Sequence, residues 1–389
     1  MTEKLYYLDA YLGEFECKVT SLYTDDKYIY VETDRTAFFP EGGGQTSDRG
    51  WLNGAYVENV QIVDGKIIHF VENNEENVQD LQNSTILKGK IDMKKRFSDM
   101  QQHSGEHIFS GIVHKLYGFN NVGFHLGSEV VTLDFNGVLT EEDICKVESL
   151  VNEAVWKNLE IRVLYPSDEE LKSITYRSKI EIEGQVRIVE IDGVDVCACC
   201  APHVKRTGEI GMVEVVNFEK YKGGTRVSIL CGERALRDIR HKLNENCKVS
   251  VITKAKQSET AAAVERLMKE KDRLDFELVG ANREILLSKT KDIDPENRII
   301  IFDSKLQGKL LVEFTEAIKE KSSEFTACFC GENGFYRYCI ASKTADLPSV
   351  AKTLNSTFNG KGGGRGEMIQ GSLEGTEEEI TAFLKNMTL

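Results

Sequence analysis

The sequence has no long hydrophobic run: no apolar stretch approaches the roughly 20 residues that a membrane-spanning helix needs. Its first residues, Met1–Asp9, contain no basic segment followed by an apolar one, so we expect no secretory signal. The ten cysteines are scattered, without the spacing of a secreted disulfide framework. These absences predict reduced thiols, a cytoplasmic location and no membrane partner.

Positive charge is also scarce, because 49 Lys and Arg residues face 63 Asp and Glu residues and leave a formal net charge of −14. This balance excludes a generally basic coat for nucleic acid, although local basic patches remain. The length of 389 residues, with 41% hydrophobic and 29% charged residues, is typical of a globular protein of two or three domains.

Hydrophobic patterning predicts a multidomain α+β fold. Residues 1–88 are rich in strand formers near Asp and Gly turns and indicate an all-β domain, a small barrel or sandwich, of which we favour the barrel. Residues 89–250 mix strands with helices, including a helix predicted over 93–117, and indicate an α+β domain. Residues 296–389 again alternate strands and helices and predict a C-terminal α/β domain.

Between these parts, residues 251–295 predict a helical arm. Apolar residues there recur with a seven-residue period, with one lysine among them: Val264, Leu267, Lys271, Leu274, Leu278, Ala281 and Ile285. Three interpretations stay open, namely a helical hairpin, a helix lying on a domain, and a coiled coil that joins two chains. A homodimer through this arm or through the C-terminal domain is therefore one alternative.

The most informative motif is split between two segments. His103 and His107 lie one helical turn apart and so share a helix face, and Cys199 and His203 follow much later. Three imidazoles and one thiolate form a normal zinc set, which predicts one Zn²⁺ per chain. The spacing does not match a His-Glu-x-x-His metalloprotease, because Glu106 stands directly before the second histidine.

Two glycine-rich segments offer backbone groups to a ligand. Gly42, Gly43 and Gly44 permit positive φ angles and close approach, although a glycine triplet is also common in plain turns. In the tail, the segment 359–366 combines glycines with two cations and suits a phosphate group, with a flexible turn as the alternative; its candidate contacts are Lys361, Gly362, Gly363, Gly364 and Arg365. The segment lacks the Gly-Lys-Ser/Thr ending of a Walker loop.

Read in order, these motifs resemble the editing half of alanyl-tRNA synthetases and, more closely, the long freestanding alanyl-tRNA editing proteins. The resemblance rests on 39–45, 100–107 and 199–204, and on 362–371, which resembles a domain shared with some DHH phosphoesterases. It covers nearly the whole chain. Two departures are visible: Thr46 stands where the family usually has Pro, and Cys200–Pro202 replace a Gly-Gly-Thr-like spacer.

The resemblance implies hydrolysis of the ester between alanine tRNA and a wrong amino acid, chiefly serine, with glycine left open as a second substrate. Zinc would polarise the ester or activate a water molecule, or would only orient the substrate if all four protein ligands bind. A pocket that hydrogen-bonds the serine hydroxyl can reject the alanyl ester. Thr36 and Gln45 are the candidates for this catalytic and reading role, with Gly42–Gly44 and Asp134 as substrate-binding residues, Asp134 by orienting a ligand histidine or else as a turn cap.

Two other classes compete with this interpretation. One is a tRNA-binding protein without catalysis, in which zinc only holds two segments together. The other is a phosphoesterase-related enzyme, which the C-terminal resemblance suggests, but no Asp-His-His run occurs in the sequence. Hydrolysis of a seryl ester on alanine tRNA distinguishes the three classes.

Overall fold

The computed structural model of the protein describes residues 2–178 and 184–388. The chain divides into two units, Met1–Cys247 and Lys248–Leu389, each with hydrophobic clusters of its own. This division supports a multidomain α+β protein, whereas the finer boundaries at 88, 250 and 295 stay predictions. Every described helix is too short or too polar to cross a lipid bilayer.

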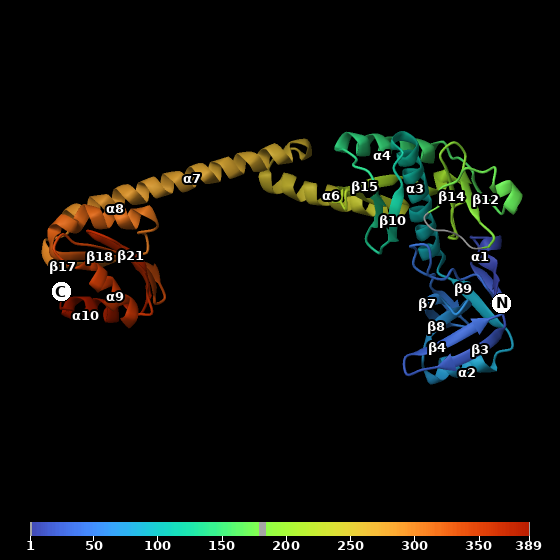
Figure 1. Cartoon of the computed structure of the whole chain (residues 1–389), viewed down its shortest axis with the longest axis horizontal. Helices are drawn as coiled ribbons and strands as arrows, with labels where there is room; N and C mark the ends of the chain where they lie inside the picture. The colour runs from blue at the N-terminus through green and yellow to red at the C-terminus, as the bar shows by residue number, and fades with distance from the viewer. Residues whose placement is uncertain (1, 179–183, 389) are drawn as a thin grey trace. The chain divides into compact units, whose positions relative to one another are not determined.

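The first part of the chain forms a curled, seven-stranded antiparallel sheet, which we call the half-barrel (Figure 1). Its order is β2-β9-β6-β7-β8-β4-β3, and among the described residues the edge strands β2 and β3 are not paired with each other, so the sheet is not a closed barrel. The strands are β2 Glu14–Cys17, β3 Val19–Thr24, β4 Tyr28–Thr33, β6 Gly50–Leu52, β7 Ala55–Val63, β8 Lys66–Glu72 and β9 Leu87–Ile91.

Two helices interrupt the region that the sequence predicts as entirely β. Helix α1 spans Leu5–Leu8 and directly follows strand β1 (Glu3–Lys4). Strand β1 pairs in parallel with the short strand β5 (Arg35–Thr36). Helix α2 spans Glu75–Asn83. The side chain of Asn74 accepts a hydrogen bond from the N–H of Asn77 and so caps the N-terminus of α2. Acidic residues in the first turn add a favourable interaction with the helix dipole. The all-β expectation was therefore wrong for these two segments, and capping by Asn74 explains the helix at α2.

The rest of the first unit packs helices on two small antiparallel sheets, ordered β10-β11-β16-β15 and β12-β13-β14. Its elements are α3 Met93–Tyr117, β10 Asn121–Leu126, β11 Val131–Phe135, α4 Glu141–Trp156, β12 Ile161–Leu164, α5 Asp168–Leu171, β13 Ile188–Ile191, β14 Asp195–Ala198, β15 Val213–Tyr221, β16 Gly224–Cys231 and α6 Gly232–Thr253. Apolar faces of α3 and α4 share one core with β11, β13 and β16.

Helix α3 has the bounds that the sequence predicts. The carboxylate of Asp92 accepts the N–H groups of Lys94 and Lys95, both at 3.1 Å, and caps the N-terminus. Gly118, with φ 71°, ends the helix in the left-handed conformation that glycine adopts without strain. Because α3 is buried over most of its length, it provides a rigid support for side chains directed into the protein.

The buried ion pair between Arg96 and Asp48 joins α3 to the half-barrel. The Arg96 Nε donates to Asp48 Oδ1 at 2.8 Å, and a second guanidinium nitrogen contacts Asp48 Oδ2. Both side chains are at most 1% exposed. The Arg96 guanidinium also donates to the carbonyl oxygen of Ala10 at 2.8 Å, so a single side chain connects α3 to two segments of the half-barrel region.

The second unit is a five-stranded sheet, ordered β17-β18-β19-β21-β20, with α8 on one face and α9 and α10 on the other (Figure 1). The predicted hairpin at Asn333-Gly334 is confirmed, because both residues have positive φ. The elements are α7 Thr260–Lys289, β17 Glu296–Phe302, α8 Lys309–Ile318, β18 Ser322–Glu332, β19 Phe335–Ala341, α9 Leu347–Thr357, β20 Lys361–Gly363, β21 Met368–Glu374 and α10 Glu377–Asn386.

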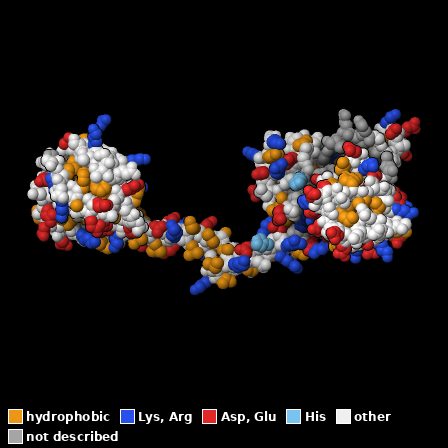
Figure 2. All heavy atoms as spheres, turned by 90° about the horizontal axis from the view of Figure 1, so that it is seen from below, with side chains coloured by type: hydrophobic (Ala, Val, Ile, Leu, Met, Phe, Trp, Pro, Cys, Tyr) orange, Lys and Arg blue, Asp and Glu red, His pale blue; other side chains and the backbone are white. Residues whose placement is uncertain are grey.

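Helix α7 confirms that the arm is helical. Much of its surface is charged, but large apolar side chains are also exposed along it (Figure 2). These side chains, which include several of the predicted heptad positions, are Val264, Leu267, Met268, Leu274, Phe276, Leu278, Val279 and Ile285.

We predict that Arg96→Met strongly destabilises the protein, because it leaves the Asp48 carboxylate buried without its charge partner. Removing one member of a buried pair costs about 3–5 kcal/mol. Urea-induced unfolding of the parent and the variant measures this loss. The matched control is Arg35→Met, since Arg35 makes exposed pairs with Glu3 at 3.5 Å and with Asp34 at 4.0 Å, each worth less than about 1 kcal/mol. Equal free energies of unfolding for the two variants would contradict the prediction.

Candidate metal centre

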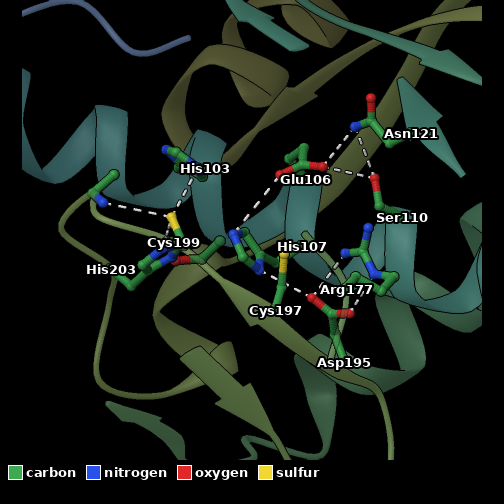
Figure 3. A network of polar contacts seen from close by, with 12 residues as sticks. His103, Glu106, His107, Ser110, Asn121, Arg177, Asp195, Cys197, Cys199 and His203 are labelled. Atoms are coloured by element: carbon green, nitrogen blue, oxygen red, sulfur yellow. Dashed lines mark hydrogen bonds and ion pairs between the residues drawn. The ribbon is translucent and has the colours of Figure 1, made fainter. Parts of the chain in front are cut away.

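The split motif is brought together in the folded chain. His103 and His107 lie on α3, and Cys199 and His203 lie in the loop that follows β14 (Figure 3). The Cys199 Sγ is 3.5 Å from His103 Nε2 and 3.3 Å from His203 Nε2. The potential ligand atoms of all four residues lie within 4.8 Å of one another, so the group can hold a metal ion.

These separations fit a tetrahedral ion. With metal–sulfur and metal–nitrogen bonds of about 2.3 and 2.0 Å, two ligand atoms on one zinc lie about 3.5 Å apart. The donor set of one thiol and three imidazoles is also one that zinc prefers. Cys199 is the cysteine that lies among the three histidines, whereas its neighbour Cys200 is exposed and Cys197 lies in a second group with His107 and Asp195.

Each histidine uses its Nδ1 for a hydrogen bond to a different residue. His103 Nδ1 is 2.7 Å from Gln45 Oε1, His107 Nδ1 is 3.0 Å from Asp195 Oδ2, and His203 Nδ1 is 3.0 Å from Ser104 Oγ. Three such acceptors would fix the proton on Nδ1 and leave each Nε2 lone pair for a metal. This is the usual outer arrangement around metal-bound histidines.

Asp195 is the carboxylate that orients His107. It also accepts a bidentate interaction from Arg177, whose Nε and second guanidinium nitrogen lie 2.8 and 2.9 Å from the two carboxylate oxygens. Burial alone would raise the pKa of Asp195, but the contacts with His107 and Arg177 outweigh it and lower this pKa below its usual value. Asp195 is therefore ionised and can hold His107 in one tautomer.

The electrostatics of the group favour a thiolate at Cys199. Burial opposes ionisation of Cys199, yet the neighbouring His103 and His203 lower the pKa of its thiol well below the usual value. Burial lowers the pKa of His203 to about 3, so this imidazole is neutral at pH 7. Burial also opposes the charged form of His107, but the hydrogen bond to Asp195 raises its pKa well above the usual value, which indicates a strongly basic ring.

The predicted glycine motif lies beside this group. Gly43 and Gly44 have positive φ, and Gly42 and Gln45 exchange two backbone hydrogen bonds across the turn. A side chain at Gly44 would lie 2.6 Å from Phe124, and one at Gly43 would lie 3.5 Å from Cys200 Sγ. Close approach to Phe124 therefore requires glycine at position 44, whereas the positive φ favours glycine at position 43.

Gln45 presents an unused donor at this position. The side chain is 1% exposed, and its Oε1 accepts from His103. Its Nε2 is buried without a hydrogen-bond partner among the described residues. A buried amide that lacks a partner costs free energy, which a ligand with an acceptor oxygen would recover.

Thr36, at the end of β5, is buried and hydrogen-bonded within the half-barrel. Its Oγ1 lies 2.8 Å from His69 Nε2 and accepts the N–H of Phe38 at 3.1 Å. The other ring nitrogen of His69 is 2.9 Å from the carbonyl oxygen of Val31, so it carries the proton and Thr36 donates to Nε2. Burial lowers the pKa of His69 to about 4, which keeps this ring neutral. A role of Thr36 toward substrate stays a prediction.

Asp134, on β11, pairs with Arg226 on β16 through two hydrogen bonds of 2.6 and 2.8 Å. The histidine-orienting carboxylate is instead Asp195, which the sequence analysis missed together with Ser104 and Arg177. A signal for Asp195 was present in the sequence, because Asp195 and Cys197 are two residues apart and so share one face of the strand that enters the ligand loop. Substrate binding by Asp134 stays a prediction.

The glycine-rich tail segment is partly a strand and not only a loop. Lys361–Gly363 form the edge strand β20, paired with β21. A side chain at Gly362 would lie 2.4 Å from Gly371 Cα and 2.8 Å from the Tyr338 hydroxyl, so packing explains this glycine, whereas Gly363 faces open space. Lys361 and Arg365 are exposed, and their predicted contact with tRNA stays a prediction.

Comparisons with known proteins agree with the resemblance of the sequence motifs to alanyl-tRNA editing proteins. The family described as the threonyl and alanyl tRNA synthetase second additional domain matches residues 186–228, which include Cys199 and His203. The chain is 27% identical over 398 residues to Alanyl-tRNA editing protein AlaX-L of Pyrococcus horikoshii, which covers 98% of this chain and 96% of that protein.

Two further relatives decide the family. Alanyl-tRNA editing protein Aarsd1-B of Xenopus laevis is 31% identical over 306 residues, covering 77% of this chain and 70% of that protein. Alanyl-tRNA editing protein AlaX-M of Methanosarcina acetivorans is 34% identical over 233 residues, covering 56% of this chain and 94% of that protein. The chain belongs to the alanyl-tRNA editing protein family, as its motifs predict.

We predict one tightly bound metal ion per chain and a loss of affinity in Asp195→Asn. An amide in place of the carboxylate no longer orients His107 or raises its basicity, and such changes weaken metal binding about 10–100-fold. Elemental analysis gives the metal content, and competition with a chelator gives the affinity. Asp192→Asn is the matched control, since Asp192 is exposed in the turn before β14. A metal affinity in Asp195→Asn equal to that of the parent would contradict the role of Asp195 in orienting His107.

Proposed function

We propose that the protein is a hydrolase that removes a wrong amino acid, chiefly serine and also glycine, from alanine tRNA after it has left the synthetase. The observation that carries this proposal is Gln45, whose amide contacts His103 through Oε1 and keeps a buried, unpaired Nε2 beside the four-residue group. Membership of the alanyl-tRNA editing family supports tRNA as the partner and an ester as the bond that is cleaved.

The metal in this proposal is one Zn²⁺ on His103, His107, Cys199 and His203. Zinc there supplies Lewis-acid polarisation or orientation of the ester group. Three protein residues orient the candidate ligands: Asp195, Gln45 and Ser104 hold the three imidazole rings. An aminoacyl ester is already activated, so positioning of this kind makes a large contribution to the rate.

Selection of the seryl ester requires a group that recognises its hydroxyl. Gln45 Nε2 is a donor that the methyl side chain of an alanyl ester leaves unpaired, whereas the hydroxyl of a seryl ester accepts a hydrogen bond from it. Thr36 supplies a second hydroxyl within the half-barrel. A site that hydrogen-bonds a substrate hydroxyl rejects the analogue without it, because its own polar group is then left unsatisfied. Gly42–Gly44 would let the backbone approach the aminoacyl group closely.

The direct test compares hydrolysis of seryl, glycyl and alanyl esters on alanine tRNA. We expect the seryl ester to be cleaved fastest and the alanyl ester to be spared. Release of labelled amino acid under single-turnover conditions measures each rate. Rates equal to those in buffer for all three esters would refute the proposed function.

Thr36→Val keeps the shape of the side chain and removes its hydroxyl. We expect the preference for the seryl over the alanyl ester to fall by about 1–3 kcal/mol, the cost of an unpaired polar group. The ratio of kcat/KM for the two esters measures the preference. Thr33→Val is the matched control, since Thr33 is buried in the same half-barrel and its hydroxyl donates to the Arg35 carbonyl oxygen. An unchanged ratio in Thr36→Val would assign the reading to another residue.

In the second unit, we propose that Lys361 and Arg365 hold tRNA phosphates beside Gly362–Gly364, with Lys352 nearby in the sequence. All three cations are exposed in an otherwise acidic chain. Each phosphate contact adds about 0.7–0.9 to the slope of log affinity against log salt. This unit would capture the substrate, and the chemistry would take place in the first unit.

Replacing Lys361 and Arg365 together by Ala should weaken tRNA binding and flatten its salt dependence by about 1.4–1.8 in that slope. Filter binding between low and physiological salt measures both quantities. We expect kcat at saturating tRNA to stay near the parent value. The control replaces Lys305 and Lys309, two exposed lysines of the same unit, by Ala. A parent-like slope in the first double variant would leave the glycine segment as a turn only.

Two further alternatives remain as candidate functions. The presence of four protein ligands favours a tRNA-binding protein with a structural zinc, because catalytic zinc sites usually keep an open position. A phosphoesterase is disfavoured, since in the described part of the chain the second potential metal group shares His107 with the first.

The exposed apolar residues of α7 suit assembly of two chains, which sedimentation at micromolar concentration would reveal.

A further inference from the structure

Asp99 lies one turn before His103 on the same face of α3 and binds two cations. Its carboxylate is 1% exposed, and it accepts from Lys95 Nζ at 2.6 Å through one oxygen and from Arg234 at 3.0 Å through the other. The side chains of Lys95 and Arg234 are 21% and 19% exposed. Neither the proposed chemistry nor the hydrophobic core accounts for this three-residue cluster.

Lys95 reaches from this cluster to the residues that directly follow Gln45. Its Nζ donates to Thr46 Oγ1 at 3.1 Å and to the carbonyl oxygen of Ser47 at 2.8 Å. Together with the contact to Asp99, these bonds use all three donors of the ammonium group. Lys95 therefore has a complete set of partners, two of which belong to the glycine loop.

Arg234, on α6, acts on the other side of the same loop indirectly, through the segment that contains Gly127. Its guanidinium donates to the carbonyl oxygen of Gly127 at 2.9 Å and to Ser98 Oγ at 3.1 Å. Gly127 follows Leu126, whose N–H donates to the carbonyl oxygen of Gly44 at 2.9 Å. The residue before Gln45 is thus held by a segment that Arg234 fixes, and the residues after it are held by Lys95.

We propose that Lys95, Asp99 and Arg234 form a latch that positions Gln45 against His103; this inference rests on the proposed function. The loop needs such a restraint, because Gly43 and Gly44 give its backbone little stiffness of its own. Among the described residues, the side chain of Gln45 makes one hydrogen bond to the site, at 2.7 Å to His103 Nδ1. Within the described residues, the hydrogen bonds of the Lys95, Asp99 and Arg234 side chains go to residues other than the four potential ligands, so we class them as positioning residues.

The charges of the latch allow a clean test. One carboxylate faces two cations, so removing either cation leaves Asp99 with one partner and creates no unpaired buried charge. Lys95→Met keeps the length of the side chain and is expected to fold. Lys94→Met is the matched control, because Lys94 is the preceding residue, is 79% exposed and approaches only Glu233, at 3.8 Å.

For Lys95→Met we expect kcat for the seryl ester to fall about tenfold, since a displacement near 1 Å can cost up to about 100-fold. KM for the tRNA should stay within about twofold of the parent, because ground-state binding is untouched. Lys94→Met should keep both parameters. A parent-like kcat in Lys95→Met would overturn the latch, and so would a change confined to KM.

A second readout is independent of activity. If Gln45 leaves His103, the ring loses its orienting partner, and the metal should be released to a chelator about tenfold faster. The Nδ1 proton resonance of His103, assigned by its loss in Gln45→Ala, should also weaken. Arg234→Met should give both changes, because it frees the other side of the loop, and Lys94→Met should give neither.

These readouts separate failure of the latch from failure of the proposed function. If the parent cleaves no ester, the proposed function fails, and metal release and the His103 resonance still decide whether the latch positions Gln45. If Lys95→Met is found unfolded by circular dichroism, Arg234→Met and Thr46→Val take its place. Parent-like metal release and an unchanged His103 resonance in the folded variants would refute the inference.

Discussion

The four-residue spacing of polar side chains along α3 sets where every other part of the candidate site must lie. His103 and His107 project from one face of the helix, and Lys95 and Asp99 continue that face toward the half-barrel. Each added or deleted residue would turn this face by about 100° and separate the histidines from Cys199. The buried helix and its fixed ends therefore hold the site in register.

The half-barrel contributes to this site by supplying a loop that α3 holds at several points. Arg96 fixes Asp48 at the base of the loop, Lys95 holds the residues after Gln45, and His103 contacts Gln45 itself. Glycines allow the loop to approach closely, but they also remove its intrinsic stiffness. The tertiary contacts restore the stiffness of the loop, so the same residues that join α3 to the half-barrel also define the position of the Gln45 amide.

The parts of the fold that the sequence predicted were those that local patterns specify. Helical periodicity predicted the extent of α3, and the spacing of His103, His107, Cys199 and His203 predicted the group that can hold a metal. The missed residues, such as Asp195, act through partners that are distant in the sequence, so the local strand pattern did not identify those partners. The sequence predicted a small barrel or sandwich and could not distinguish these from a curled sheet, because strand propensity does not specify which edges pair.

The central claim is that a metal on the four-residue group and the Gln45 amide together cleave the seryl ester. The most direct measurement is single-turnover hydrolysis of seryl ester on alanine tRNA by the protein as purified, after removal of its metal, and after restoration of one Zn²⁺ per chain. We predict that activity is lost with the metal and returns at one equivalent. Full activity in the metal-free protein, with its fold intact by circular dichroism, would contradict the account.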